Sequence, residues 1–141
     1  LHVTHNDTKI NNLLFCKESK QPIAVIDLDT CMPGLLMHDF GDMVRTCCST
    51  LPEDGSNIDE MEIRLDIFDA LLQAYIAGFG DNISEIEKQS LITGARLLPF
   101  MIGVRFLTDY IDGDNYFSTQ YDEHNLVRAK NQFQLFSLLF Y

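Results

Sequence analysis

The sequence contains no tryptophan, and its 141 residues include only four prolines, four cysteines and ten lysines and arginines. Against these ten basic residues stand 21 aspartates and glutamates, which gives a formal net charge of −11 at pH 7. A nucleic-acid-binding surface is therefore not expected, because such surfaces need clustered positive charge. An acidic surface keeps a protein soluble, although an acidic cleft also attracts metal ions or cationic substrates.

Long apolar runs and metal-binding cysteine spacings are also missing. The longest apolar stretch, residues 97–104, contains Pro99 and lies between Arg96 and Arg105. It is far shorter than the ~20 residues that a membrane span needs. No two cysteines are spaced C-x-x-C, and none pairs with histidine at zinc-finger intervals. We therefore expect no membrane contact and no signal peptide, and a cytoplasmic protein with reduced thiols.

What the sequence does contain is enough apolar material for one packed domain. Hydrophobic residues make up 46% of the chain and aromatic residues 11%, and 141 residues are too few for two ordinary domains. Residues 1–4 alternate like a short strand, and residues 5–12 form a polar loop. Two strand-like runs, 13–16 and 23–26, flank a polar turn and predict a β-hairpin. Residues 30–37 are predicted to form a loop.

The middle of the chain has helical periodicity. Asp39 is placed to cap a helix whose apolar residues follow helical spacing. The pattern Asn57-x-x-Glu60 predicts a capping box, because a side chain at each position can satisfy a backbone N–H of the other. Behind it, apolar residues at steps of three and four predict an amphipathic helix that includes residues 61–79.

The second half of the chain is predicted to be helical as well. Ser84-x-x-Glu87 predicts another capping box. The dense apolar residues 91–107 predict one or two central helices, broken near Pro99. Apolar periodicity over residues 126–140 predicts a C-terminal helix. The expected fold is therefore α+β and mainly α-helical, with a small hairpin followed by four to six helices.

The residues with recognisable chemistry lie at the start of the chain. The polar loop has the form His-x-Asp-x-x-x-x-Asn, with His5, Asp7 and Asn12, and Asp27 follows at the end of an apolar strand. Phosphoryl transfer needs a carboxylate for the acceptor's hydroxyl proton and hard oxygen ligands for Mg²⁺. The alternative interpretation is a turn followed by a capped strand. It is disfavoured because Asp27 at the end of a buried strand is costly without a partner.

This order of loop, hairpin and strand-terminal aspartate resembles the protein-kinase-like fold, specifically the aminoglycoside phosphotransferase and choline kinase-like family of small-molecule kinases. The resemblance implies that Asp7 is the catalytic base and that Asn12 and Asp27 bind Mg²⁺. It also implies that His5 stabilises the loop and packs against the metal-binding segment. Lys9 occupies the place where many protein kinases keep a lysine that contacts the transferred phosphate, although most small-molecule kinases of this family lack it.

Further segments are similar to the N-acetylhexosamine kinases. These enzymes phosphorylate the anomeric hydroxyl of N-acetylglucosamine or N-acetylgalactosamine, so the resemblance implies ATP and Mg²⁺ as cofactors and a sugar as acceptor. The remaining alternatives are another small-molecule kinase, acting on choline, ethanolamine or aminoglycosides, and a non-catalytic binding module. The segments that carry the resemblance are Asn6–Asn12, Val25–Thr30, Met32–Gly34, Arg105–Phe117 and His124–Ala129.

The resemblance covers only the C-terminal lobe of such a kinase. No glycine-rich phosphate loop and no nucleotide-binding sheet are found in residues 1–141. We therefore expect the N-terminal ATP-binding lobe of the same polypeptide to be absent from this chain. Residues 1–141 are predicted to form the catalytic and substrate lobe and to be inactive as a fragment.

Four further side chains have competing interpretations. Asp29 is predicted to be a second metal ligand, a sugar-hydroxyl acceptor or a turn cap. Asp39 is an N-cap or, as in related kinases, a brace for the catalytic loop. Arg105 forms an ion pair with Asp109 at helical spacing, or its guanidinium reaches sugar hydroxyls or a phosphate. Tyr116 contacts a sugar ring or is an ordinary half-buried tyrosine. The resemblance favours substrate binding for Arg105 and Tyr116.

Overall fold

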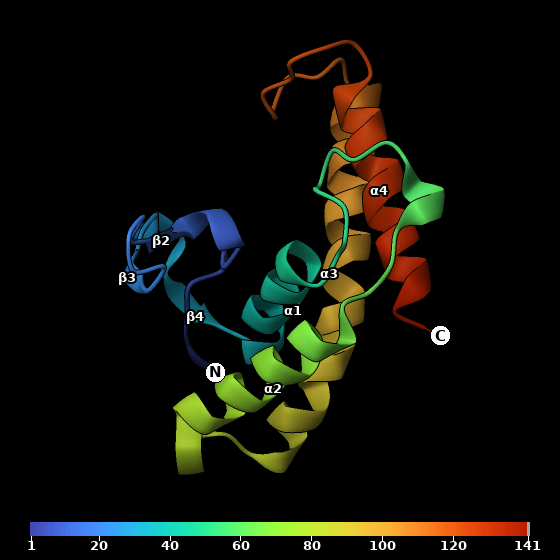
Figure 1. Cartoon of the computed structure of the whole chain (residues 1–141). Helices are drawn as coiled ribbons and strands as arrows, with labels where there is room; N and C mark the ends of the chain where they lie inside the picture. The colour runs from blue at the N-terminus through green and yellow to red at the C-terminus, as the bar shows by residue number, and fades with distance from the viewer. Residues whose placement is uncertain (141) are drawn as a thin grey trace.

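The computed structural model describes residues 1–140, which form two small β-ribbons on one side of an α-helical bundle (Figure 1). The α+β, mainly helical fold class is thereby confirmed. The helices are α1 (Leu36–Cys47), α2 (Leu65–Phe79), α3 (Glu85–Ile111) and α4 (His124–Leu138). The strands are β1 (His2–Thr4), β2 (Leu13–Phe15), β3 (Pro22–Val25) and β4 (Met32–Gly34). Short 3₁₀ turns are η1 (Ile10–Asn12), η2 (Leu28–Thr30), η3 (Ile58–Glu60) and η4 (Gly80–Asn82).

One of the two ribbons was predicted from the sequence and the other was not. Strands β2 and β3 form the expected antiparallel hairpin, with Leu13 opposite Val25. Strands β1 and β4 also pair antiparallel, with His2 opposite Gly34. The prediction of a loop over residues 30–37 was therefore wrong at β4. This three-residue strand contains a proline and is defined by its pairing with a partner about 30 residues away, which local patterns do not reveal.

The strand in front of Asp27 is exposed. All four residues of β3 lie at the surface of the described chain, so the expectation of a buried strand was wrong. The reason is geometric: an isolated two-stranded ribbon has no second layer to cover its faces. Asp27 therefore stands at the end of an exposed apolar strand.

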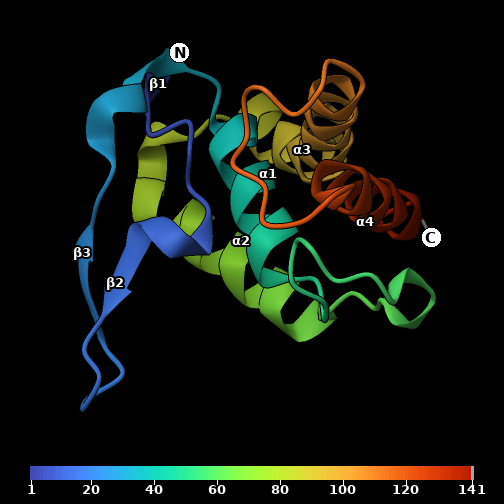
Figure 2. The ribbon, with the colours of Figure 1, turned by 90° about the horizontal axis from the view of Figure 1, so that it is seen from above.

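The core lies where α1, α2, α3 and α4 meet. Figure 2 shows α1 beside the ribbons and α3 and α4 on its far side. Phe40 and Val44 of α1, Leu91 of α3 and Leu135 of α4 are fully buried. Helix α2 covers another side of α1, where the ring of Phe40 packs against Phe68 and Tyr75. Burying each such side chain contributes about 1.5–3 kcal/mol, so α1 is fixed firmly relative to α3.

Helix α3 runs without a break from Glu85 to Ile111 and contains Pro99. The prediction of a break near Pro99 was wrong. A proline inside a helix loses one backbone hydrogen bond and costs about 3 kcal/mol. Because Pro99 is fully buried, tertiary packing offsets this cost and the helix continues.

By length and composition alone, α3 is also apolar enough to cross a membrane. It contains Arg96, Arg105 and the buried Asp109. In this structure it packs against both α1 and α4 and is the central helix of the bundle.

The helix starts test the capping predictions. The box at Ser84 is confirmed: its hydroxyl accepts a hydrogen bond from the Glu87 backbone N–H, and the Glu87 carboxylate accepts one from the Ser84 N–H. The box at Asn57 was wrong, because Asn57 precedes only η3 and its side chain caps nothing. The N-cap role of Asp39 was also wrong, because Leu35 precedes α1 and Asp39 lies inside the first turn.

Gly94 allows α1 and α3 to approach closely. A Cβ atom at this position would lie 1.9 Å from the Met37 carbonyl oxygen of α1. We expect Gly94→Ala to lower the free energy of unfolding by about 1–3 kcal/mol or more, because two backbones must separate. Urea unfolding of the chain measures this. Gly78→Ala in α2, where a Cβ meets nothing within 4 Å, should instead stabilise by about 0.5–1 kcal/mol. Equal midpoints for Gly94→Ala and wild type would contradict the packing described.

Candidate active site

The polar loop 5–12 is anchored to the first turn of α1 by Asp39. The Asp39 carboxylate is buried and accepts hydrogen bonds from the backbone N–H groups of His5 (2.8 Å) and Asn6 (2.7 Å). The Thr8 hydroxyl donates to the Asp39 backbone carbonyl at 2.6 Å. These bonds occupy the Asp39 carboxylate, so Asp39 does not cap a helix and holds the loop in place, which is the other role that the resemblance implies for it.

His5 connects the loop to the segment that carries Asp27. Its Nδ1 accepts a hydrogen bond from the Asp7 backbone N–H at 3.3 Å, and its Nε2 lies 3.0 Å from the Ile26 carbonyl oxygen. An acceptor at Nδ1 and a donor at Nε2 define the neutral tautomer that carries its proton on Nε2. The Thr30 hydroxyl donates to the His5 carbonyl at 2.7 Å. The loop and the segment around Asp27 are therefore held in one unit.

Asp7 has one carboxylate oxygen in use and one free. Lys9 Nζ and Asn12 Nδ2 both donate to Asp7 Oδ2, at 2.8 and 2.9 Å, and Asn12 Nδ2 also donates to the Asp7 backbone carbonyl. Within residues 1–140, Asp7 Oδ1 has no hydrogen-bond partner. Partial burial alone would raise the pKa of Asp7, but the hydrogen bonds from Lys9 and Asn12 and the charge of Lys9 outweigh it, so the pKa lies below its usual value.

A backbone hydrogen bond brings the segment that carries Asp27 next to Asn12. The Ile26 N–H donates to the Asn12 carbonyl at 2.9 Å, which places Asp27 one residue from this bond. The Asn12 amide nitrogen is occupied by Asp7, so its amide oxygen is the group left for a ligand. Asp27 is exposed and adopts a left-handed backbone conformation (φ 63°, ψ 55°).

These two side chains fit Mg²⁺. Mg²⁺ takes hard oxygen ligands, usually one or two carboxylates, and completes its shell with water and substrate phosphates. Asn12 supplies an amide oxygen and Asp27 a carboxylate from two different elements. Residues 1–140 contain no cluster of three or more histidines, cysteines, aspartates or glutamates of the kind that zinc sites use.

A cavity of about 430 Å³, here called the main cleft, opens beside Asp7 and Lys9. Its walls come from the loop, from α1 and the segment after it, from α3 and α4, and from the 112–123 connection, which Figures 1 and 2 show above the end of α1. The lining residues are Asn6, Asp7, Lys9, His38, Asp42, Arg45, Glu53, Leu98, Met101, Ile102, Arg105, Phe106, Phe117, Ser118 and Arg128.

Ion pairs form the α1 wall of the main cleft. Arg45 Nε donates to Asp42 Oδ1 at 2.6 Å, and Arg45 Nη1 donates to the Glu53 carboxylate. Burial raises the pKa of Asp42 above its usual value despite the opposing charge of Arg45. The pairing joins α1 to the segment after it, and Arg45 offsets one of the two carboxylate charges on this wall.

Arg105 does not pair with Asp109. The Arg105 side chain is exposed, and its guanidinium carbon lies 5.3 Å from the Phe117 ring centre and 5.6 Å from that of Tyr116. Asp109 is buried and accepts hydrogen bonds from the backbone N–H groups of Tyr116 (2.8 Å) and Phe117 (2.9 Å). The ion-pair interpretation of Arg105 was therefore wrong, because Asp109 holds the 112–123 connection instead.

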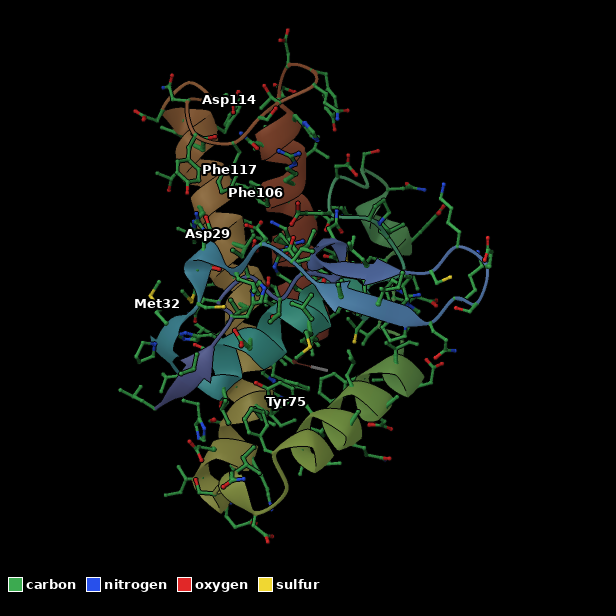
Figure 3. The ribbon with its side chains drawn as sticks, turned by 90° about the vertical axis from the view of Figure 1, so that its left-hand side faces the viewer. Asp29, Met32, Tyr75, Phe106, Asp114 and Phe117 are labelled. Atoms are coloured by element: carbon green, nitrogen blue, oxygen red, sulfur yellow. The ribbon has the colours of Figure 1, made fainter. Side chains whose placement is uncertain are left out.

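The predicted site residues do not all reach one cavity. Asp7, Lys9 and Arg105 line the main cleft. Tyr116 is 73% exposed and lines a neighbouring cavity together with Arg105, so it lies at the rim. Asp29 is exposed on η2 (Figure 3) and lines neither cavity. The role assigned to each of these residues stays a prediction.

The first 87 residues of the chain match a known protein family. A family model described as the APH phosphotransferase enzyme family matches residues 1–87. The chain belongs to this family. The matched region contains the loop, both ribbons, α1 and α2, and therefore every residue of the Asp7, Asn12 and Asp27 group. Enzymes of this family transfer a phosphoryl group from ATP, usually with Mg²⁺, so the chain is a kinase-type phosphotransferase.

Sequence reasoning assigned no role to several residues of the phosphotransferase's main cleft. Asp42 and Arg45 of α1 are both buried although they are charged, and opposite charges three residues apart in a helix are a signal that was available in the sequence. No local sequence pattern marks Glu53 or Arg128 as a cleft residue, because only the tertiary fold brings these side chains to α1.

Proposed function

We propose that this phosphotransferase transfers the γ-phosphoryl group of ATP to the anomeric hydroxyl of N-acetylglucosamine or N-acetylgalactosamine. One observation carries the proposal. Asp7 keeps one carboxylate oxygen free beside a cleft of monosaccharide size, which Arg105 and Phe117 also line. Aromatic side chains with a few well-placed polar groups are the usual lining of a small-molecule site, and a sugar offers both hydroxyl groups and apolar ring faces to such a lining.

The charge of the main cleft supports a neutral acceptor. Although the chain carries a net charge of −11, the cleft is lined by four cationic side chains and three carboxylates. A polycationic aminoglycoside or a quaternary ammonium acceptor would meet no net negative potential here. A neutral polyhydroxylated acceptor instead finds both donors and acceptors. The cationic residues are Lys9, Arg45, Arg105 and Arg128, and the carboxylates are Asp7, Asp42 and Glu53.

In this proposal Asp7 acts on the acceptor hydroxyl. Its free Oδ1 accepts a hydrogen bond from the acceptor hydroxyl and then takes the hydroxyl proton. The hydroxyl oxygen forms a bond to the γ-phosphorus, and the bond between that phosphorus and the oxygen of the leaving ADP breaks. Lys9 and Asn12 hold Oδ2 and thereby fix the direction of Oδ1. Asn12 and Asp27 would hold Mg²⁺, which when bound neutralises charge on the phosphate oxygens.

We further propose that a nucleotide-binding lobe outside residues 1–141 covers the ribbons. Apolar side chains of the ribbons and of the segment after them are exposed next to Asp27, and a soluble surface rarely displays so many together. A lobe that binds adenine on this side would bury them and complete the ATP site. We also propose a cytoplasmic location, which the four free cysteines support. The exposed side chains are Leu14, Phe15, Ile23, Val25, Ile26, Leu28 and Met32.

An acceptor panel tests the proposed function. The enzyme with both lobes is incubated with ATP and Mg²⁺ and with N-acetylglucosamine, N-acetylgalactosamine, choline, ethanolamine or an aminoglycoside, and ADP release is measured by a coupled assay. Turnover of the two hexosamines well above the other acceptors is the expected result. Turnover of choline or an aminoglycoside without turnover of the hexosamines would refute the sugar assignment and leave the family unaffected.

Lys9 should control the acid side of the enzyme's pH profile. Lys9→Met removes a hydrogen bond and a positive charge from Asp7 while the burial remains, so the Asp7 pKa rises. Because an ionised Asp7 is needed, the acid limb of kcat/KM should move to higher pH. The exposed Lys88–Glu85 pair (2.6 Å) offers the matched control, since Lys88→Met should leave the profile in place. An acid limb that does not move in Lys9→Met would mean that Asp7 does not set it.

A further inference from the structure

Two guanidinium groups and two aromatic rings form a continuous row of contacts on the wall of the main cleft, with the two rings tilted by 52° against each other. The Arg105 guanidinium lies over Phe117, the Phe117 and Phe106 ring centres are 4.7 Å apart, and the Arg128 guanidinium carbon lies 5.4 Å from the Phe106 ring centre. Figure 3 shows Phe106 and Phe117 side by side, below Asp114 of the connection. Arg128 comes from α4, which contributes no other residue to the cleft.

The orientation of Arg128 is fixed by a buried network. Its Nη1 donates to the Ser118 carbonyl at 3.1 Å and to Asn125 Oδ1 at 3.0 Å. Asn125 is fully buried, and its amide nitrogen donates to the carboxylates of Asp109 (2.9 Å) and Asp114 (2.8 Å). The guanidinium is therefore preorganised, so little side-chain entropy is lost when it binds a ligand.

Arg128 also lacks a carboxylate partner within residues 1–140. The other two cations near it are paired, Lys9 with Asp7 and Arg45 with Asp42 and Glu53. The Nε and Nη2 donors of Arg128 make no hydrogen bond to any described residue, so both are available to a ligand that accepts hydrogen bonds.

Arg128 stands at the junction of two cavities. It lines the main cleft and a second cavity of about 380 Å³, which also contains the apolar side chains of Ile10, Leu51 and Pro52. A substituent that reaches Arg128 from the main cleft can therefore place an apolar end in the second cavity. The nearby carboxylate of Glu53, which lines both cavities, disfavours an anionic substituent and favours a neutral carbonyl.

We propose that Arg128 is a specificity-determining residue that donates hydrogen bonds to the carbonyl oxygen of the acceptor's acetamido group, a role that rests on the proposed hexosamine kinase function. The acetamido methyl group enters the second cavity. Arg128 thereby distinguishes an N-acetylhexosamine from a hexose, which carries a hydroxyl group instead of the acetamido group at C2 of the sugar ring.

The test compares two acceptors that differ only at this carbon. Kinetics of the enzyme with both lobes are measured with N-acetylglucosamine and with glucose, and the ratio of the two kcat/KM values is the readout. Arg128→Met should lower this ratio by about 10–100-fold, chiefly through the KM for N-acetylglucosamine, as expected for a lost charged hydrogen bond. Arg128→Lys, which keeps the positive charge and hydrogen-bond donors, should give an intermediate ratio. This variant replaces Arg128→Met in the test if Arg128→Met does not fold.

Arg96 provides a matched control. It also donates to a backbone carbonyl, that of Leu139 at 2.9 Å, and its guanidinium carbon lies 4.9 Å from the Phe140 ring centre, but it lies outside both cavities. Arg96→Met should leave the ratio unchanged. If Arg128→Met lowers kcat/KM for both acceptors by the same factor, Arg128 is structural or contacts the phosphoryl group, and the proposal is wrong. If the wild type phosphorylates neither N-acetylglucosamine nor N-acetylgalactosamine, the proposed function itself fails.

Discussion

Replacing Asp7 with asparagine should lower kcat by about 10²–10⁴-fold and leave the KM for the sugar nearly unchanged, because a general base acts mainly in the transition state. Asparagine has the same shape and keeps an oxygen that accepts the hydrogen bonds from Lys9 and Asn12. What it loses is the negative charge and the basic oxygen that face the acceptor hydroxyl. Steady-state kinetics of the enzyme with both lobes, with sugar and ATP varied separately, measure both constants.

A matched substitution separates this effect from a general loss of charge. Asp69 lies on the exposed face of α2, away from the main cleft, and Asp69→Asn should retain wild-type kinetics. Thermal unfolding of both variants should also match the wild type within a few degrees. If Asp7→Asn keeps most of its turnover, the catalytic base is another residue, and Asp42, the next carboxylate along the same cleft, becomes the first to examine.

The second large effect is expected at Asp27. Asp27→Ala should abolish turnover with every acceptor, because it removes the carboxylate proposed to hold Mg²⁺ and leaves only the amide oxygen of Asn12. The left-handed backbone at Asp27 strains an alanine, so Asp27→Gly is the cleaner variant, because glycine adopts a positive φ without steric strain. Both variants should be inactive, although only the alanine variant should lose stability.

Two further substitutions sharpen the test at Asp27. Lys20 also has a positive φ, 60°, and lies in the turn of the same hairpin, so Lys20→Ala should remain active. Arg105→Ala should raise the KM for the sugar by about 10–100-fold while the Mg²⁺ dependence stays as in the wild type. Matched titrations with Mg²⁺ and with sugar distinguish the two sites. If Arg105→Ala changes neither KM nor kcat, Arg105 only supports Tyr116 and Phe117, and the acceptor does not touch it.

The elements that the sequence predicts correctly are those set by local patterns. The hairpin of β2 and β3 follows from two apolar runs around a polar turn, and the start of α3 follows from the Ser84–Glu87 capping box. Strand β4 and the uninterrupted α3 could not be predicted in this way. Each depends on a partner distant in sequence: β1 for β4, and the packing around Pro99 for α3.

In the candidate site, too, local spacing predicts some residues and long-range packing determines the others. Asp7, Asn12 and Asp27 are recognisable because their spacing reflects one loop and one hairpin. Helical spacing alone placed Asp39 at a helix cap, and only the resemblance suggested that it braces the loop, because the two backbone N–H groups that its carboxylate binds lie about 33 residues earlier. Arg128 lies in a segment that the resemblance includes, but its place beside Phe106 follows only from the packing of α4 on α3.

The identity of the phosphorylated atom tests the central claim most directly. The enzyme with both lobes is incubated with ATP, Mg²⁺ and N-acetylglucosamine, and the product is examined by two-dimensional ¹H–³¹P correlation NMR. The account predicts a single new phosphate whose phosphorus couples to the anomeric proton of the sugar. A phosphorus coupled to the protons at the sugar's primary alcohol, or the absence of any phosphorylated sugar while another acceptor is turned over, would contradict it.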